Sequence, residues 1–199
     1  MAASLPGPDP QSVFLNVPFD PVYEPCFVTL VATLISLGQT PRCVLEVRET
    51  GQGRLTRIFE LVRSCGVSMH DLSRVGVPVR FNMPFELGIA CSLALSGEPH
   101  DIVVLDTARY RLDKTLSDYK GRDPLIYSNL GELVDAIADV FQVADEPAPD
   151  LLKKEARFLR KSASVIAASY GGTIFRRAAF RALVAAATRR AKSQGLIPA

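Results

Sequence analysis

Short apolar runs that alternate with helical segments constrain the fold of this 199-residue chain more than any other feature of its sequence. The run DIVVLD (101–106) is apolar throughout its interior, as is typical of a central strand in a parallel sheet. Four other runs have a similar length and are rich in apolar and β-branched residues: SVFLNV (12–17), RCVLEV (42–47), VSMHDLS (67–73) and DPLIYS (123–128). We therefore expect five β-strands in this order.

Segments with helical periodicity separate most of these runs. The clearest is 54–66, in which Leu55, Ile58, Phe59 and Val62 recur on one helical face. The other such segments are 23–38 with Gly38 as its C-cap, 82–97 with Asn82 as its N-cap, and 129–141 with Asn129 as its N-cap. Five strands, four of them followed by a helical segment, predict an α/β fold with a parallel sheet covered on both faces. The number of strands favours a flavodoxin-like order, 2-1-3-4-5.

The chain divides into an α/β domain and a helical appendage. Residues 1–11 are typical of a disordered arm, and 12–143 contain all five strands and the four helical segments. A Pro-rich linker (144–150) then leads into residues 151–199, which contain two helical stretches separated by Gly171 and Gly172. We expect this last segment to form a helical hairpin.

Charge separates the two parts of the chain sharply. Residues 1–150 carry 12 Lys and Arg against 20 Asp and Glu, whereas residues 151–199 carry 11 Lys and Arg and a single acid, Glu155. The basic hairpin could dock on the acidic domain or form a homo-oligomer interface. Clustered basic residues also suit nucleic acid, because they displace counterions from phosphates, and a basic amphipathic helix suits an anionic membrane surface. A protein or nucleic-acid partner at 151–192 is thus an open expectation.

The sequence contains no features of a membrane protein or a metalloprotein. No apolar run approaches the roughly 20 residues that a membrane-spanning helix needs, and the N-terminus lacks the features of a signal peptide. The four cysteines form no C-x-x-C pair, and only two histidines are present. We expect a cytoplasmic protein without a metal or a disulfide framework.

Polar residues cluster at one predicted edge of the sheet. In an open parallel sheet, ligands bind at the carboxyl ends of the strands, beside the point where the strand order reverses. In the order 2-1-3-4-5 this point lies between the first and third strands. The candidate site residues that the two strands and the next helix bring there are Asn16, Phe19, Asp20, Asp71, Ser73, Arg74, Asn82 and Glu86.

Glu86 is the most unusual of these residues because it stands between Phe85 and Leu87 at the start of an apolar helix. The helix dipole and free backbone amides favour the ionised carboxylate there, whereas apolar neighbours oppose it by desolvation. A rigid, half-dry carboxylate can stabilise positive charge on a substrate or attack it. Cleavage at an anomeric carbon, through an oxocarbenium-like transition state, is the chemistry that most needs such a group.

Three stretches carry a family resemblance: VFLNVPFD (13–20), IFELVRSCGVSMHDLS (58–73) and FNMPFELGIA (81–90). They resemble the superfamily that joins nucleoside 2-deoxyribosyltransferases, related nucleotide N-glycosidases and Toll/interleukin-1 receptor (TIR)-like NAD hydrolases. The resemblance spans residues 12–142 in strand order. It implies that Glu86, within the sequence ELGIA, acts on the ribose as nucleophile or charge stabiliser.

The chain departs from both main branches of that superfamily. Deoxyribosyltransferases commonly have an Asp where this chain has Gln52, Gly53 and Arg54, and often a Tyr where it has Phe14 or Phe19. TIR-like hydrolases usually have a Trp shortly before the glutamate, and this chain contains none. The sequence therefore resembles a divergent member that keeps the glutamate but has altered specificity residues.

Several candidates have two readings. Asp71 could bind ribose hydroxyls or activate water, or it could cap a turn through backbone amides. Asp20 suits the N-cap of the first helix as well as a substrate contact, and Phe19 suits base stacking or a core contact. Arg74 and Arg80 could meet a phosphate, or they could pair with a neighbouring acid.

Two functional hypotheses follow. The first is an N-glycosidase that acts on a small-molecule nucleotide or nucleoside without a cofactor, with NAD as the leading substrate. Glu86 and Asp71 would be its catalytic residues. The resemblance implies a role in bacterial defence. The second is a non-catalytic nucleotide sensor or oligomerising signalling module. A scaffold that binds no ligand, with Glu86 merely solvated, is a third reading.

Overall fold

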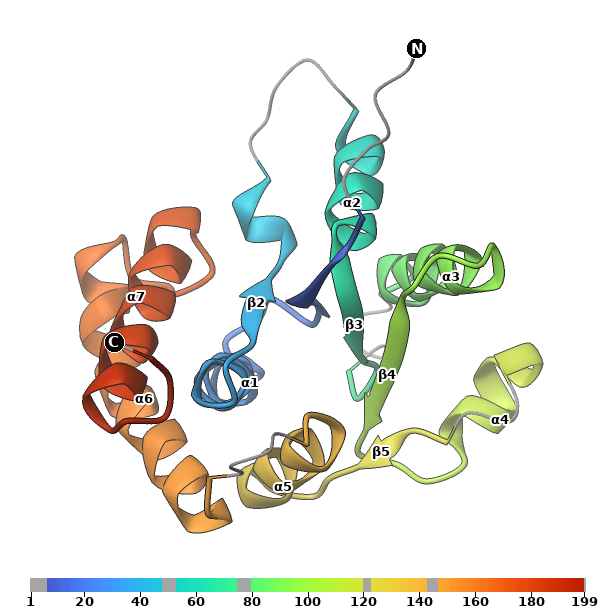
Figure 1. Cartoon of the computed structure of the whole chain (residues 1–199). Coiled ribbons are helices and arrows are strands. Elements are labelled where there is room, and N and C mark those ends of the chain that lie inside the picture. Colours follow the sequence, from blue (N-terminus) through green and yellow to red (C-terminus); the bar gives the residue numbers. More distant parts are fainter. Residues whose placement is uncertain (1–6, 48–52, 75–79, 120–122, 143–146, 199) are drawn as a thin grey trace.

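The structure is a computed structural model that describes residues 7–47, 53–74, 80–119, 123–142 and 147–198. Its centre is a parallel sheet with the strand order β2-β1-β3-β4-β5 (Figure 1). The strands are β1 (Asp9–Asn16), β2 (Thr40–Arg42), β3 (Cys65–Asp71), β4 (Asp101–Asp106) and β5 (Leu125–Ile126). The expected α/β fold class and strand order are confirmed.

The helices follow the strands in the expected sequence. Their bounds are α1 (Glu24–Ser36), α2 (Arg54–Arg63), α3 (Asn82–Leu95), α4 (Arg111–Thr115), α5 (Leu130–Val140), α6 (Pro149–Ser169) and α7 (Arg177–Ser193), with short 3₁₀ turns η1 (Val44–Glu46) and η2 (Ser117–Tyr119). None of the helices in the described ranges combines the length and apolar character needed to cross a membrane.

The first two strands differ from the sequence-based bounds. β1 begins at Asp9, which pairs with Cys65, so residues 9–11 belong to the sheet rather than to an arm. The expected strand 42–47 is wrong after Arg42, because the Glu46 carboxylate turns back to accept hydrogen bonds from the Cys43 amide (3.0 Å) and Arg42 Nε (2.9 Å). Residues 1–6, Gln52, Val143 and the linker residues 144–146 lie outside the described residues.

Two asparagines expected to cap helices behave differently. The Asn129 side chain accepts hydrogen bonds from the Gly131 and Glu132 amides, so the predicted cap of α5 is confirmed. Asn82 is instead the first helical residue of α3, and the preceding Phe81 occupies the N-cap position without a side-chain hydrogen bond. The prediction of an Asn82 cap is therefore wrong.

The sheet sends alternate side chains to two different layers. Val13 and Leu15 of β1 belong to the large apolar cluster on the face that α1 and α5 cover. Phe14, which lies between them, packs instead with the apolar residues of α2 and α3 on the other face. The side chains of β3 alternate in the same way, so that Ser68 and His70 lie on the α2–α3 face and Asp71 lies on the α1–α5 face.

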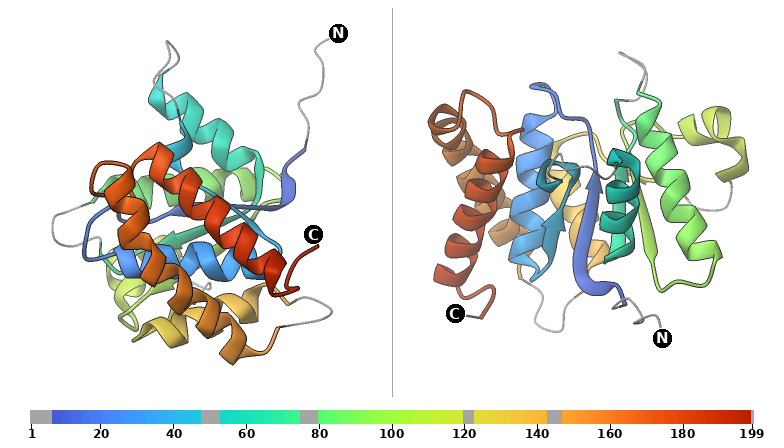
Figure 2. Two further views of the ribbon diagram at one scale, coloured as in Figure 1. Left: turned by 90° about the vertical axis from the view of Figure 1, so that its left-hand side faces the viewer. Right: turned by 90° about the horizontal axis from the view of Figure 1, so that it is seen from above.

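The basic C-terminal segment forms a third layer. Helices α6 and α7 pack on α1 and on each other, so that α1 is enclosed between the sheet and this hairpin (Figure 2). All ten residues from Phe27 to Ser36 are buried as a result, which explains why α1 is apolar on every side. The single acid of the segment, Glu155, is buried and paired with Arg190 (2.6 Å between Oε2 and Nε). The predicted helical hairpin is thus docked on the acidic domain.

Candidate functional site

Glu86 lies in the second turn of α3 with only 7% of its surface exposed. It shares a helix face with Ala90 and Leu93, which pack against α2 in the second apolar cluster. Burial raises the pKa of the Glu86 carboxyl to about 7, although the Asn82 side chain and the charge of Arg54 act to lower it. Near neutral pH this carboxyl is therefore present in both its protonated and its ionised form.

Because the two forms are nearly balanced, a nearby charge can change the protonation state of Glu86. An apolar setting penalises the anion, and the Asn82 amide and the Arg54 cation only partly offset the penalty. A cationic group placed beside the carboxyl would favour the anion and expel the proton. The site can thus present a carboxylate to a positive centre, which is the arrangement that charge stabilisation requires.

Asn16 connects the end of β1 to the first turn of α3. Its amide nitrogen donates to the Met83 carbonyl oxygen and to His70 Nδ1, both at 2.8 Å. Because an amide nitrogen only donates, His70 Nδ1 accepts and the proton of this imidazole is on Nε2. Both amide hydrogens of Asn16 are therefore occupied, and the residue holds α3 against the sheet.

A chain of neutral hydrogen bonds continues from His70 along the same face of the sheet. His70 Nε2 donates to Ser68 Oγ (2.9 Å), which leaves the Ser68 proton for His100 Nε2 (2.9 Å). His100 Nδ1 then donates to the Cys65 carbonyl oxygen (2.9 Å). Burial lowers the pKa of His70 to about 3, and His100 nearby adds to the shift, so this network is uncharged at neutral pH.

Asp71 lies on the opposite face from that chain and is fully buried. Its Oδ2 accepts hydrogen bonds from Tyr23 (2.5 Å) and Tyr127 (2.7 Å), while Oδ1 accepts from the Ser73 amide (2.9 Å). Burial raises the pKa of Asp71, and these hydrogen bonds counteract part of the increase. The bond to Ser73 has the geometry of the turn-capping reading, and the two tyrosines close the carboxylate off from solvent.

Asp20 gathers two arginines at the carboxyl end of the sheet. Its Oδ2 accepts from Arg80 Nη2 (2.7 Å) and Arg74 Nε (3.2 Å), and its Oδ1 accepts from the Val22 and Tyr23 amides just before α1. Burial alone would raise the pKa of Asp20, but the hydrogen bonds from Tyr23 and Arg74 and the two cationic charges lower it overall. One carboxylate thus faces two cations, and the excess charge is positive.

Phe19 packs in the core instead of lining an open crevice. Its ring lies 5.9 Å from that of Phe27 in α1 and 5.6 Å from that of Phe175, which precedes α7. Ser73 is half-buried, and its hydroxyl lies 3.3 Å from the hydroxyl of Tyr127. Of its two readings, Phe19 matches the core contact.

The structure brings together only some of the predicted residues. Asn82, Glu86 and the Asn16 side chain lie on the α2–α3 side, whereas Asp71 and its tyrosines lie on the α1–α5 side. The sequence did not single out Tyr23 or Tyr127, whose contacts span 48 and 56 positions. Nothing in local spacing reveals partners so far apart along the chain.

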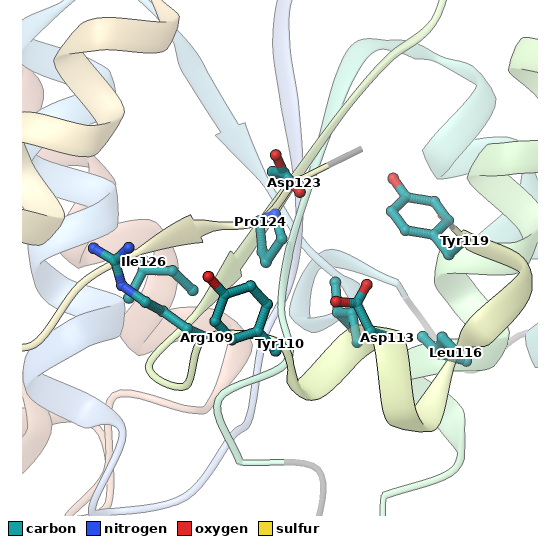
Figure 3. Close-up of a pocket in the computed structure, with 9 residues that line it drawn as sticks. Arg109, Tyr110, Asp113, Leu116, Tyr119, Asp123, Pro124 and Ile126 are labelled. Atoms are coloured by element: carbon teal, nitrogen blue, oxygen red, sulfur yellow. The ribbon is translucent and has the colours of Figure 1, made fainter. Parts of the chain in front are cut away.

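A separate pocket of about 220 Å³ opens between β5 and α4 and contains none of the predicted residues. Figure 3 shows Tyr110 at its centre, between Arg109 and Asp113 and below Pro124. Tyr110 has a φ of 60°, the only positive value among the described non-glycine residues. No group of three or more His, Cys, Asp or Glu residues in the described part of the chain could hold a metal ion.

Comparison of the chain with protein-family models and with curated proteins finds no match in either set.

Proposed function

We propose that this protein is an N-glycosidase that hydrolyses the bond between the base and the ribose of a nucleotide, with NAD as the leading substrate. The observation that carries the proposal is Glu86, a nearly buried carboxyl with a pKa raised by burial to about 7 at the carboxyl end of the sheet. Its place in the resemblance to N-glycosidases and TIR-like NAD hydrolases agrees with this chemistry.

In the proposed reaction the C–N bond to the base breaks first, and the base leaves with the electron pair. Positive charge develops on the ribose, and ionised Glu86 stabilises it. Water then adds to the anomeric carbon and loses a proton, so the products from NAD are neutral nicotinamide, ADP-ribose and one proton. The cationic nicotinamide ring of the bound substrate would itself favour ionised Glu86.

Arg74 offers a contact for a substrate phosphate. It is half-buried and lies 3.2 Å from Asp20, and its guanidinium group can also donate to a phosphate. This contact favours phosphorylated substrates over free nucleosides.

The test is release of base, followed by chromatography, from NAD, NADP and a panel of nucleotides and nucleosides. Wild type is expected to release base, whereas Glu86→Gln is expected to lose at least about 100-fold in rate, because it removes an interaction made in the transition state. Glu98→Gln is the matched control, since Glu98 follows the far end of α3 and pairs with Arg63. Equal turnover by wild type and Glu86→Gln would contradict the proposal.

The pH dependence adds a second readout. If ionised Glu86 is required, kcat/KM should rise with pH and level off above the pKa of the free enzyme, near 7. A rate that falls through the same range would mean that the protonated form acts, as a general acid.

A non-catalytic nucleotide sensor is the second candidate, and a specific observation favours it. Asp71, which the enzyme hypothesis uses as a catalytic residue together with Glu86, is fully buried on the opposite face of the sheet and is bound by Tyr23 and Tyr127. Nucleotide binding by both wild type and Glu86→Gln, without turnover by either, would identify the sensor.

A further inference from the structure

A pocket of about 270 Å³ lies between the start of α3 and helix α4, at the carboxyl ends of β3 and β4. Its walls include Leu72, Leu112 and Pro84, and the guanidinium-bearing residues Arg80 and Arg111 border it. The pocket is therefore mostly apolar, with two cationic side chains at defined positions.

Both arginines are held in place by buried or half-buried carboxylates. Arg111 forms an ion pair with Asp106, which is fully buried at the end of β4, and also donates to the Leu72 carbonyl oxygen (3.1 Å). Arg80 is fixed by the 2.7 Å contact with Asp20. The guanidinium groups need little reordering to receive a ligand, which lowers the entropic cost of binding.

The protein leaves one hydrogen-bond donor of the arginines without a partner and part of their positive charge without a counter-charge. Arg80 Nε is buried and has no hydrogen-bond partner among the described residues. Asp20 and Asp106 supply two negative charges against the three positive charges of Arg74, Arg80 and Arg111. An anion at this place would balance the charge.

The rim of the pocket carries a large exposed aromatic ring. Phe81, at the N-cap of α3, leaves 81% of its surface in solvent although it lines the pocket. A flat ring of a ligand can stack on Phe81 while it buries its other side against the leucines and Pro84. The combination of an aromatic platform and arginines suits a ring that carries a negative group.

This pocket is separate from the surroundings of Glu86. Pro84 faces the pocket and α4, whereas Glu86 lies two residues further on, about 200° around the helix, on the face that packs toward α2. The two features therefore lie on opposite flanks of α3. A ligand in the pocket would not contact Glu86.

We propose that the α3–α4 pocket binds a small ligand in which an aromatic ring carries one anionic group, a carboxylate or a phosphate. The ring stacks on Phe81, and the anionic group is bound by Arg80 and Arg111. The proposal does not rest on glycosidase activity, because it requires nothing of Glu86.

Binding is tested by calorimetry on the full-length protein with two matched pairs of probes, benzoate with benzamide and AMP with adenosine. Each pair shares its ring and differs in the anionic group. Saturable binding of at least one anion, roughly tenfold or more tighter than its uncharged partner, is the expected result, since the uncharged partner cannot form charge-assisted hydrogen bonds with the two arginines. Which anion binds tells whether a carboxylate or a phosphate is preferred. Binding of neither anion, or equal binding of charged and uncharged partners, would overturn the proposal.

Variants locate the bound probe. Arg80→Met and Phe81→Ser are each expected to weaken it about tenfold or more. Arg109→Met should leave it unchanged, because Arg109 is exposed and does not line this pocket. Phe81→Ser is the variant least able to disturb the fold, since this ring is mostly in solvent. Binding that is insensitive to both Arg80→Met and Phe81→Ser would place the ligand elsewhere and refute the assignment.

The chain offers a further reporter because it contains no tryptophan. Phe81→Trp introduces a single fluorophore at the rim, and its emission is expected to change with the bound anion and not with the uncharged partner. In the Phe81→Trp background, Glu86→Gln should leave this response unchanged. Loss of the response in Glu86→Gln would show that the ligand occupies the Glu86 site, and the separate pocket would be refuted while the glycosidase proposal stands.

Discussion

Helices α1 and α3 are both apolar on nearly every side, but the protein treats them differently. α1 is enclosed by the sheet on one side and by α6 and α7 on the other. α3 has an outer side that nothing in the described part of the chain covers, and Phe81, Phe85 and Leu95 there are exposed. An apolar sequence on every side of a helix therefore shows that the helix can be fully buried. Only the tertiary structure shows that α1 is enclosed and α3 is not.

The difference extends to the buried glutamate that each region contains. Glu155 of α6, in the layer that covers α1, is paired with Arg190 through both oxygens (2.6 and 3.1 Å). Glu86 of α3 is shielded from water without an ion pair among the described residues, and burial raises its pKa. A buried carboxylate with an ion-pair partner is explained by its place in the fold. A buried carboxylate without one lowers the stability of the folded state when it is ionised, and a function can explain why it is there.

The largest expected effect comes from removing the cover of α1. A chain that ends at Gln142 loses α6 and α7, whose buried Leu152, Leu159, Phe180 and Leu183 each contribute about 1.5–3 kcal/mol. Together these approach a typical total stability of ~5–15 kcal/mol, so the truncated chain should be unfolded or aggregated by circular dichroism and gel filtration. Co-expression of residues 147–199 should restore a folded complex. A truncated chain that stays monomeric and unfolds cooperatively would show that α1 needs no cover.

Two leucine-to-alanine substitutions compare the covered and bare regions directly. Leu159 is 1% exposed against α1, and Leu159→Ala should lower the free energy of unfolding by about 2–5 kcal/mol. Leu95 on α3 is 86% exposed, and Leu95→Ala should change it by less than about 0.5 kcal/mol. Urea unfolding measures both. Similar losses in the two variants would mean that the outer side of α3 is covered in solution.

Near pH 8, replacing each of the two glutamates by glutamine should change the free energy of unfolding in opposite directions. Because the pKa of Glu86 is about 7 in the folded state and 4.5 ordinarily, the folded protein binds the proton more tightly, and stability falls as pH rises between these values. Glu86→Gln should therefore stabilise the protein by about 1–3 kcal/mol near pH 8 and have little effect near pH 5.

Glu155→Gln is the matched comparison for that change. It removes a charged bidentate contact with Arg190 and should destabilise the protein by about 1–3 kcal/mol near pH 8. Urea unfolding of both variants at the two pH values gives the answer. Destabilisation by Glu86→Gln near pH 8 would mean that its carboxylate has a strong partner in the folded state.

The sequence was most informative where a local rule decides the structure. The apolar interior of 101–106 identified β4 with its observed bounds, and Asn129 capped α5 as its position before an amphipathic segment predicts. β2 ended early because the Glu46 carboxylate turns back onto Arg42 and Cys43, a choice that β-propensity alone does not reveal. Local rules thus gave the order of the elements and missed some of their ends.

The candidate site was less accessible from sequence because its geometry depends on distant partners. Glu86 stood out as a carboxylate among apolar residues, and its burial agrees with that reading. The sequence predicts that Asp71 lies beside Glu86, yet the alternation of β3 directs Asp71 toward Tyr23 and Tyr127 on the other face. Which face of a sheet each helix covers is a property of the whole fold, and the 48-residue separation of Tyr23 from Asp71 leaves no local trace.

The most direct test of this account is an NMR titration of the Glu86 side-chain carboxyl carbon in the free protein, with Glu86→Gln to assign the signal. The account predicts a midpoint near pH 7, because burial opposes the charged form, and a lower midpoint when NAD brings its cationic ring to the site. A midpoint near the ordinary value of 4.5 would contradict it, since Glu86 would then be a solvated carboxylate with no special role.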